Sequence, residues 1–288
     1  MYKRQLLGPR DEAIIPAPYW VSYPDMVRLA EAEPIVIDTG IEQDFKITPD
    51  RLESAISDRT RLLILNSPSN PTGVSYSRAE LEKLGAVLER HPNIVVLSDD
   101  IYEHIHWAAE PFASFATACP TLRDRTVTTN GVSKAYAMTG WRIGYAAGPQ
   151  EFITAMTTIQ SQSTTNPCSV SQAAAVAALN GDQTCVRHMT AAYKERHDYI
   201  VGALNQFDGI ECRPGEGTFY AFARIEELLS ARGMASDVEF VELLLNQADL
   251  ACVPGSAFGA PGHVRLSFAC SMEMLEESVR RITRALMA

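Results

Sequence analysis

The chain has 288 residues, of which 46% are hydrophobic and 21% are charged, so it can bury a large core in one domain or in two of unequal size. Its net charge is −10, from 25 basic and 35 acidic residues, and no run is rich in Lys or Arg. This argues against a nucleic-acid surface, which needs clustered cations. No apolar stretch has the length of a membrane span, and the N-terminus lacks the layout of a signal peptide, so we expect no membrane partner.

The six cysteines lie far apart in the sequence and form no CxxC pair (residues 119, 168, 185, 212, 252 and 270). This spacing is typical of reduced thiols and not of a disulfide framework. We therefore expect a cytoplasmic protein.

The first part of the chain alternates predicted strands and helices. Apolar runs predict strands over residues 13–16, 34–38 and 61–66, and the last of these has the continuous apolar pattern of a parallel strand buried on both faces. Helices are predicted over residues 21–30 and 48–56, the second opened by Thr48 and Pro49 as N-cap and first helical residue. The loop over residues 67–73 follows, and its Asn70 offers an amide at a strand end. A plain Asx turn would also explain this asparagine.

A capping box formed by Ser77 and Glu80 predicts a helix over residues 77–90, followed by a buried strand over 94–97. That strand runs into Asp99, Asp100 and Tyr102. Carboxylates at the end of a buried strand are costly unless a cation lies nearby, so a cationic group is expected there.

His104 and His106 would share one face of a strand and form a candidate metal pair. No third ligand with suitable spacing follows in the sequence, so we expect no metal site.

Residues 126–148 predict a β-branched strand, a turn that carries Ser133 and Lys134, and a second strand that begins at Arg142. A lysine at the end of a buried strand reaches a cleft, where desolvation turns its amine into a nucleophile for carbonyls. Arg142 is permanently charged and suits a phosphate. Taken alone, such a Lys and Arg pair is more often explained as two solvated charges at a strand end.

The last part of the chain predicts a connecting helix over residues 182–207, ended by Gly209, and then a small α+β domain. We place a large domain at residues 1–181 and the helix with the small domain at 182–288. Arg265 lies in an otherwise apolar strand, HVRLSFA, and such a charge needs an anion. A structural ion pair is the alternative to a ligand.

The string GVSKAYAMTGWRIG (residues 131–144) resembles the active-site lysine segment of the class I/II aminotransferases, which are fold-type I enzymes that use pyridoxal 5′-phosphate (PLP). The segments LLGPRDEAIIPAPYWVSY, NSPSNPTG and SDDIY also resemble family motifs, although Arg10 and Asp100 depart from the usual Gly and Glu. The resemblance runs from Leu6 to the C-terminus and is nearest to the aspartate-aminotransferase-like branch. It implies an α/β fold: a three-layer large domain with a mostly parallel sheet, and a smaller α+β C-terminal domain.

The resemblance also implies a role for each candidate residue. Lys134 binds the PLP aldehyde and moves a proton, and Asp99 contacts the ring nitrogen. Asn70 and Tyr102 contact the phenolic oxygen. Trp20 is implied to stack on the cofactor ring, and Arg142 with Ser133 to bind the phosphate. Arg265 is implied to bind the substrate α-carboxylate, and Asn70 to contact the substrate as well. For Trp20, a place in the core is the alternative.

The implied reaction is transamination between an amino acid, most simply aspartate, and a 2-oxo acid such as 2-oxoglutarate, in a homodimer. A β-lyase on the same fold and an aminotransferase-like regulatory domain remain alternatives. The family's N-terminal arm and its Gly-rich phosphate-binding loop have no counterpart in this sequence, so we expect weak PLP binding and doubtful activity from the chain as it stands.

Overall fold

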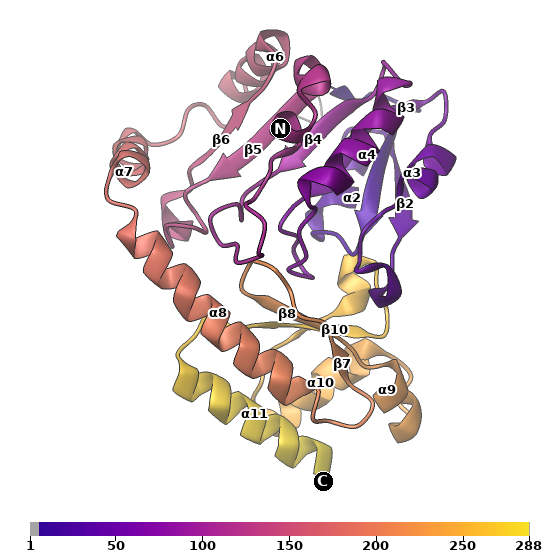
Figure 1. The fold of residues 1–288 in the computed structure, drawn as a ribbon, viewed down its shortest axis with the longest axis vertical. Helices are drawn as coiled ribbons and strands as arrows, with labels where there is room; N and C mark the ends of the chain where they lie inside the picture. Colours follow the sequence, from indigo (N-terminus) through magenta and orange to yellow (C-terminus); the bar gives the residue numbers. More distant parts are fainter. Residues whose placement is uncertain (1–5, 288) are drawn as a thin grey trace.

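The structure, a computed structural model, describes residues 6–287. It contains two β-sheets, with the larger one in the upper part of Figure 1 and the smaller one below it. The strand order of the larger sheet is β2-β1-β3-β4-β5-β6; the first five run parallel and β6 is antiparallel to β5. Its strands are β1 (Glu12–Ala17), β2 (Glu33–Asp38), β3 (Thr60–Asn66), β4 (Val95–Asp99), β5 (Thr126–Gly131) and β6 (Gly144–Ala147).

Helices cover both faces of the larger sheet, because its central strands are apolar on both sides. In β3, Leu63 and Leu65 pack with α3 and α4, whereas Leu62 and Ile64 pack on the other side with Val27 of α2 and with α6. This is the three-layer arrangement expected from the sequence. The helices of this part are α2 (Ser22–Arg28), α3 (Pro49–Ala55), α4 (Arg78–Glu89), α5 (Phe115–Ala118), α6 (Gln150–Ser161) and α7 (Ser169–Asn180).

Local signals set several of these boundaries. Thr48 caps α3 by accepting a hydrogen bond from the Arg51 amide, and Ser77 and Glu80 form the predicted capping box at the start of α4. Both helix starts were therefore predicted correctly.

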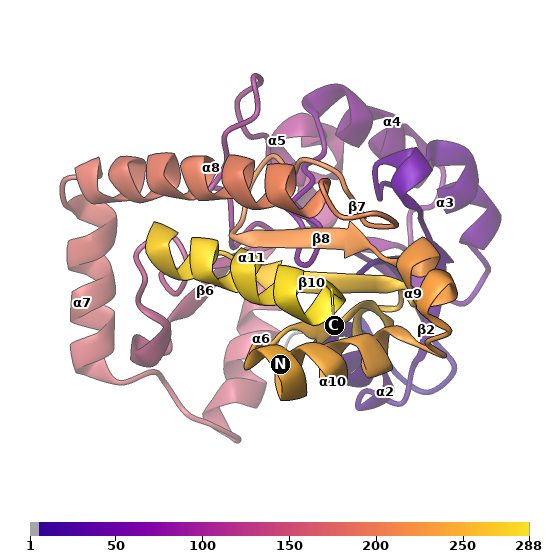
Figure 2. The ribbon, with the colours of Figure 1, turned by 90° about the horizontal axis from the view of Figure 1, so that it is seen from below.

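The smaller sheet is antiparallel, with the order β7-β8-β10-β9. Figure 2 shows α8, α10 and α11 lying across it, where apolar residues of these helices and strands form one core. The predicted α+β character is confirmed. The elements are α8 (Thr184–Leu204), β7 (Glu211–Cys212), β8 (Tyr220–Arg224), α9 (Glu226–Arg232), α10 (Asp237–Ala248), β9 (Val253–Pro254), β10 (His263–Ser267) and α11 (Met272–Met287).

Three local predictions were wrong. Arg142 does not begin a strand: its φ of 55° turns the chain after a 3-10 turn (η3, Thr139–Trp141), and β6 starts at Gly144. The connecting helix stops at Leu204; Gly209 instead permits a close approach, since a Cβ there would lie 2.6 Å from the Leu228 nitrogen. His104 lies in a turn and His106 in an isolated bridge, so they share no strand face.

Within residues 6–287, no helix combines the length and the apolar character needed to cross a membrane.

Candidate active site

A cavity of about 930 Å³ opens at the carboxyl ends of β3, β4 and β5, beneath which β8 and β10 of the smaller sheet contribute side chains. In parallel α/β sheets, ligands bind at this edge. Seven of the eight residues predicted from the sequence line the cavity, while Ser133 lies half-buried in the turn beside Lys134 and is not among the lining residues. The seven are Trp20, Asn70, Asp99, Tyr102, Lys134, Arg142 and Arg265.

Lys134 follows β5 by three residues and extends over aromatic rings. Its Nζ lies 5.7 Å from the ring centroid of Tyr102 and 5.5 Å from that of Phe219. The end of β5 packs closely against the chain that leads into β6: a Cβ at Gly131 would lie 2.8 Å from the Ile143 carbonyl oxygen. An amine held against rings in a cleft is placed to attack a carbonyl compound.

Asp99, the last residue of β4, faces the cavity with a fixed carboxylate. Its Oδ2 accepts a hydrogen bond from Tyr23 Oη at 2.5 Å, and its Oδ1 accepts one from the Ile101 amide at 3.4 Å. We did not predict the role of Tyr23. The only indication in the sequence is that Tyr23 follows Trp20 by about one helical turn in PYWVSY. A core tyrosine would fit this position equally well.

Asn66 ties the ends of two strands together and was also missed. Its Nδ2 donates to the Asp99 carbonyl oxygen at 2.8 Å, and its Oδ1 accepts from the Asn70 amide at 2.8 Å. The signal was a polar residue closing the apolar run RLLILN. This contact fixes the spacing between Asn70 and Asp99.

Arg265 comes from β10 and reaches across to the larger sheet. Its Nη1 donates to Asn70 Oδ1 at 2.8 Å, and its guanidinium carbon lies 4.2 Å from the ring centroid of Tyr220 and 4.7 Å from that of Phe258. Burial lowers the pKa of Arg265, and its Nε is buried without a hydrogen-bond partner. No carboxylate of the described part of the chain pairs with it, so the ion-pair alternative is not observed. A partly buried guanidinium without an anion suits a carboxylate ligand.

Tyr102 and Tyr220 pair at the junction of the two sheets, with their hydroxyl oxygens 3.4 Å apart. Burial, followed by the neighbouring Tyr220, raises the pKa of Tyr102 well above its ordinary value, so Tyr102 stays a phenol and a hydrogen-bond donor at neutral pH. Tyr220 was missed because Thr-Phe-Tyr in a short strand does not reveal which ring faces the cleft.

Two further lining residues lie at the mouth of the cavity. Arg142 is exposed, and its Nη1 donates to the Thr139 carbonyl oxygen at 3.1 Å. The ring of Trp20 stands perpendicular to that of Tyr23, with 5.4 Å between centroids. Both side chains are therefore accessible to a ligand in the cavity.

The comparison with known families decides the identity of the chain. Residues 2–282 match the family described as Aminotransferase class I and II. The chain belongs to this family.

Individual aminotransferases agree with this assignment. The chain is 54% identical over 286 residues to an aspartate/prephenate aminotransferase of Nitrosomonas europaea, covering 97% of this chain and 72% of that protein. It is 48% identical to an aspartate aminotransferase of Rhizobium meliloti, covering 97% of this chain and 69% of the relative.

Solved structures of aminotransferases also share the fold. The aspartate aminotransferase from Rhizobium meliloti superposes with a TM-score of 0.95 at 46% identity, over 99% of this chain and 73% of that one. An aspartate aminotransferase from Thermus thermophilus with maleate superposes with a TM-score of 0.89 at 39% identity. The match covers 99% of this chain and 72% of that one. The predicted fold type and enzyme class are confirmed.

The residues of this aminotransferase fit a PLP molecule. The cavity offers an amine (Lys134), a carboxylate fixed by a phenol (Asp99), a neutral phenol (Tyr102) and an exposed guanidinium (Arg142). In the part of the chain that the structure describes, no group of three or more His, Cys, Asp or Glu side chains is arranged to hold a metal ion.

Proposed function

We propose that this aminotransferase transfers the amino group of aspartate to a 2-oxo acid, with 2-oxoglutarate as the acceptor and PLP as the cofactor. The convergence of Lys134, Asp99, Asn70 and Arg265 on one cavity is the observation that carries the proposal. The relatives named for aspartate support the substrate, and those named aspartate/prephenate make prephenate a second acceptor to test.

PLP, when bound, supplies a conjugated ring that takes up the electron pair left when the bond between Cα and its hydrogen breaks. The Asp99 carboxylate, held by Tyr23, would keep the ring nitrogen protonated. The phenol of Tyr102 and the amide of Asn70 would hold the phenolic oxygen. Arg142 with Ser133 would bind the phosphate, and Trp20 would cover the ring.

The remaining roles belong to the substrate. Arg265 would bind its α-carboxylate, with Asn70 fixing the guanidinium. Lys134 would take the proton from the substrate Cα and deliver it to a carbon of the cofactor, acting as base and then acid. Its position against the rings of Tyr102 and Phe219 keeps the amine inside the cavity.

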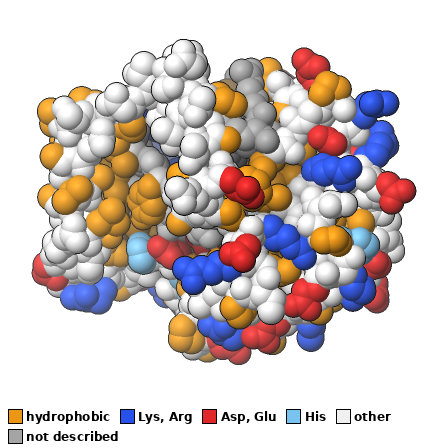
Figure 3. Space-filling view, turned by 90° about the horizontal axis from the view of Figure 1, so that it is seen from above, with side chains coloured by type: hydrophobic (Ala, Val, Ile, Leu, Met, Phe, Trp, Pro, Cys, Tyr) orange, Lys and Arg blue, Asp and Glu red, His pale blue; other side chains and the backbone are white. Residues whose placement is uncertain are grey.

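We further propose two domains, residues 1–181 and 182–288, each built around one of the two sheets, and a homodimer. Figure 3 shows hydrophobic side chains gathered on the left of one face, the side on which Figure 1 places α7. Exposed apolar side chains there are Val170, Val176 and Leu179 of α7, Trp141 of η3 and Tyr145 of β6. Large exposed apolar patches are typical of association surfaces. The free thiols of all six cysteines support a cytoplasmic location.

The decisive experiment measures aspartate turnover by the purified protein loaded with PLP. We expect turnover only when 2-oxoglutarate is present, and none from Lys134→Ala. Pyruvate and ammonia release without an oxo acid would identify a β-lyase instead. If the protein binds PLP and still shows neither activity, the proposed function is wrong and the regulatory alternative stands.

A further inference from the structure

A loop of the smaller sheet is inserted between two loops of the larger sheet. This boundary loop, residues 213–218, joins β7 to β8. The amides of Glu216 and Gly217 both donate to the Gly73 carbonyl oxygen, at 2.8 and 3.0 Å, and the Thr218 amide donates to the Ile105 carbonyl oxygen at 2.9 Å. The backbones lie so close that a Cβ at Gly217 would be 2.5 Å from the Ile105 oxygen.

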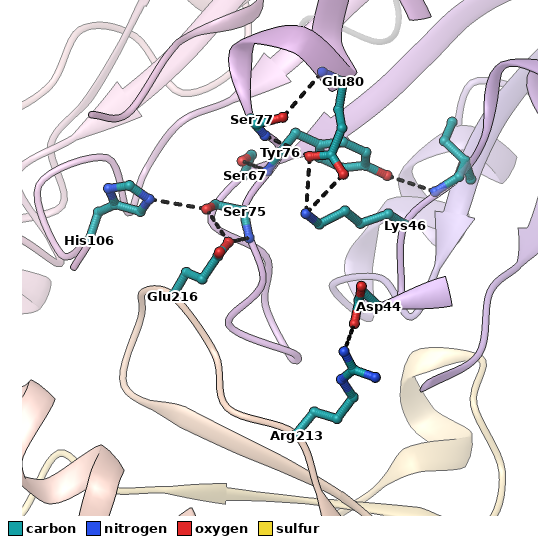
Figure 4. Close-up of polar contacts among 11 residues, drawn as sticks. Asp44, Lys46, Ser67, Ser75, Tyr76, Ser77, Glu80, His106, Arg213 and Glu216 are labelled. Atoms are coloured by element: carbon teal, nitrogen blue, oxygen red, sulfur yellow. Dashed lines mark hydrogen bonds and ion pairs between the residues drawn. The ribbon is translucent and has the colours of Figure 1, made fainter. Parts of the chain in front are cut away.

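Glu216 adds a side-chain contact across the same boundary (Figure 4). Its Oε2 accepts from the Ser75 amide at 3.1 Å and from Ser75 Oγ at 2.6 Å, and His106 Nε2 lies 3.0 Å from the same Oγ. A carboxylate only accepts, so the Ser75 hydroxyl donates to Glu216 and the His106 ring donates to Ser75.

This order of groups excludes a hydrolytic triad, in which the imidazole stands between the serine and the acid. Here the serine stands in the middle and is buried. The contact therefore holds two segments together.

The segment that it holds contains a proposed substrate contact. Residues 70–75 touch the smaller sheet at both ends: Asn70 accepts from Arg265, and Ser75 donates to Glu216. The segment is also tied to the residue before it, because the Gly73 amide donates to the Ser69 carbonyl oxygen at 2.8 Å. Glu216 itself does not line the cavity.

We infer that Glu216 is a positioning residue, which acts through Ser75 to keep Asn70 and Arg265 in register for the substrate carboxylate. The inference rests on the proposed function of that pair. A substrate carboxylate competes with Asn70 for the guanidinium of Arg265, which weakens the attachment of residues 70–75 at their first residue. The bonds of the Glu216 side chain to Ser75 remain and, with the backbone bonds to Gly73, keep the segment in place.

Hydrogen exchange of the backbone amides tests the contact without any catalysis. In Glu216→Ala we expect faster exchange in residues 213–218 and also in residues 70–75, with the rest of the larger sheet unchanged. Glu216→Gln, which can still accept from Ser75, should lie between this variant and the wild type. Asp44→Asn is the matched control, because Asp44 pairs with Arg213 at the same boundary but on the surface. Faster exchange confined to residues 213–218 would overturn the inference.

Kinetics of the PLP-loaded protein test the consequence. The KM of Glu216→Ala should rise roughly tenfold for aspartate and for the 2-oxo acid alike, as for one lost charge-assisted hydrogen bond, with kcat and the PLP absorbance unchanged. A fall in kcat at unchanged KM would count against a positioning role. If the wild type does not transaminate, the proposed function fails, and the exchange result still decides the role of Glu216. Should Glu216→Ala not fold, Ser75→Ala removes the hydroxyl bond to Glu216 and leaves the amide bond, so it should give the same two patterns at smaller size.

Discussion

The hydroxyl oxygen of Tyr23 lies 2.5 Å from Oδ2 of Asp99, although the two residues are 76 positions apart in the sequence. Tyr23 belongs to α2 on one face of the larger sheet, and Asp99 closes β4 at its edge. A phenol that donates to a carboxylate stabilises the charged form and holds it in one orientation. The proposed partner of the PLP ring nitrogen is therefore set by a helix as well as by its own strand.

We expect Tyr23→Phe to lower aspartate turnover about tenfold, because a hydrogen bond to a charged group contributes about 1.5–3 kcal/mol. Asp99→Asn should lower it further, since a neutral amide cannot hold a protonated ring nitrogen. Steady-state kinetics of both variants make the test, with Tyr136→Phe as control, because the Tyr136 hydroxyl bonds Gln183 instead of a cavity residue. If Asp99→Asn keeps a normal rate and Asp100→Asn loses activity, then Asp100, and not Asp99, contacts the ring nitrogen.

Lys134 should be the residue that binds PLP covalently. Borohydride reduction of the protein with PLP, followed by peptide mapping, should label Lys134 because its amine lies inside the cavity. Lys194 serves as the internal control, since it is exposed and pairs with Asp198 at 2.5 Å. Labelling of Lys194 in place of Lys134 would refute the assignment.

Arg265→Ala should weaken aspartate and the 2-oxo acid equally, because both carry the carboxylate that Arg265 is proposed to bind. The expected loss in kcat/KM is about 1.5–3 kcal/mol or more for each. Arg224→Ala is a suitable control, since Arg224 lies on the adjacent strand and pairs with Glu42 and Glu211 near the surface. A loss for one substrate alone would indicate side-chain recognition.

Asp100 should make the free energy of unfolding depend on pH. Burial raises its pKa to about 7, against the hydrogen bond from Ser98, and its Oδ2 has no partner. The folded protein thus binds this proton more tightly than the unfolded chain, so the stability that it contributes is complete below about pH 4 and is lost as the pH rises to about 7.

Asp100→Asn should remove this loss and be more stable than the wild type at pH 8, by about 1–4 kcal/mol. Urea unfolding at pH 5 and pH 8 measures the difference. The exposed Asp124→Asn should behave like the wild type, and an equal pH dependence in Asp100→Asn would disprove the assignment.

The sequence predicted those features that depend on local chemistry. The capping box of Ser77 and Glu80 and the apolar run before Asn66 each specify an element without outside contacts. The carboxyl ends of parallel strands meet at one edge, so the convergence of Asn70, Asp99 and Lys134 could also be predicted. The three-layer fold was implied by the resemblance to the class I/II aminotransferases.

Contacts between distant segments could not be predicted. The pairing of Glu216 with Ser75 spans 141 positions, and nothing in either neighbourhood specifies the other. Tyr23 and Tyr220 are tyrosines in apolar elements, and only the packed structure shows that their hydroxyl groups face polar partners. Arg142 was predicted to begin a strand, because the sequence gives no sign that a non-glycine residue will adopt a positive φ.

The two sheets divide the work of the cavity unequally. Lys134, Asp99 and Tyr102 belong to the larger sheet, whereas Arg265 and Tyr220 come from the smaller one. On the proposed roles, the residues of the reaction chemistry lie between Asp99 and Lys134, and those that bind the acid lie mainly between Tyr220 and Arg265. Substitutions around β8 and β10 can therefore alter the range of accepted acids while the lysine chemistry stays intact, so laboratory evolution of new substrates should begin there.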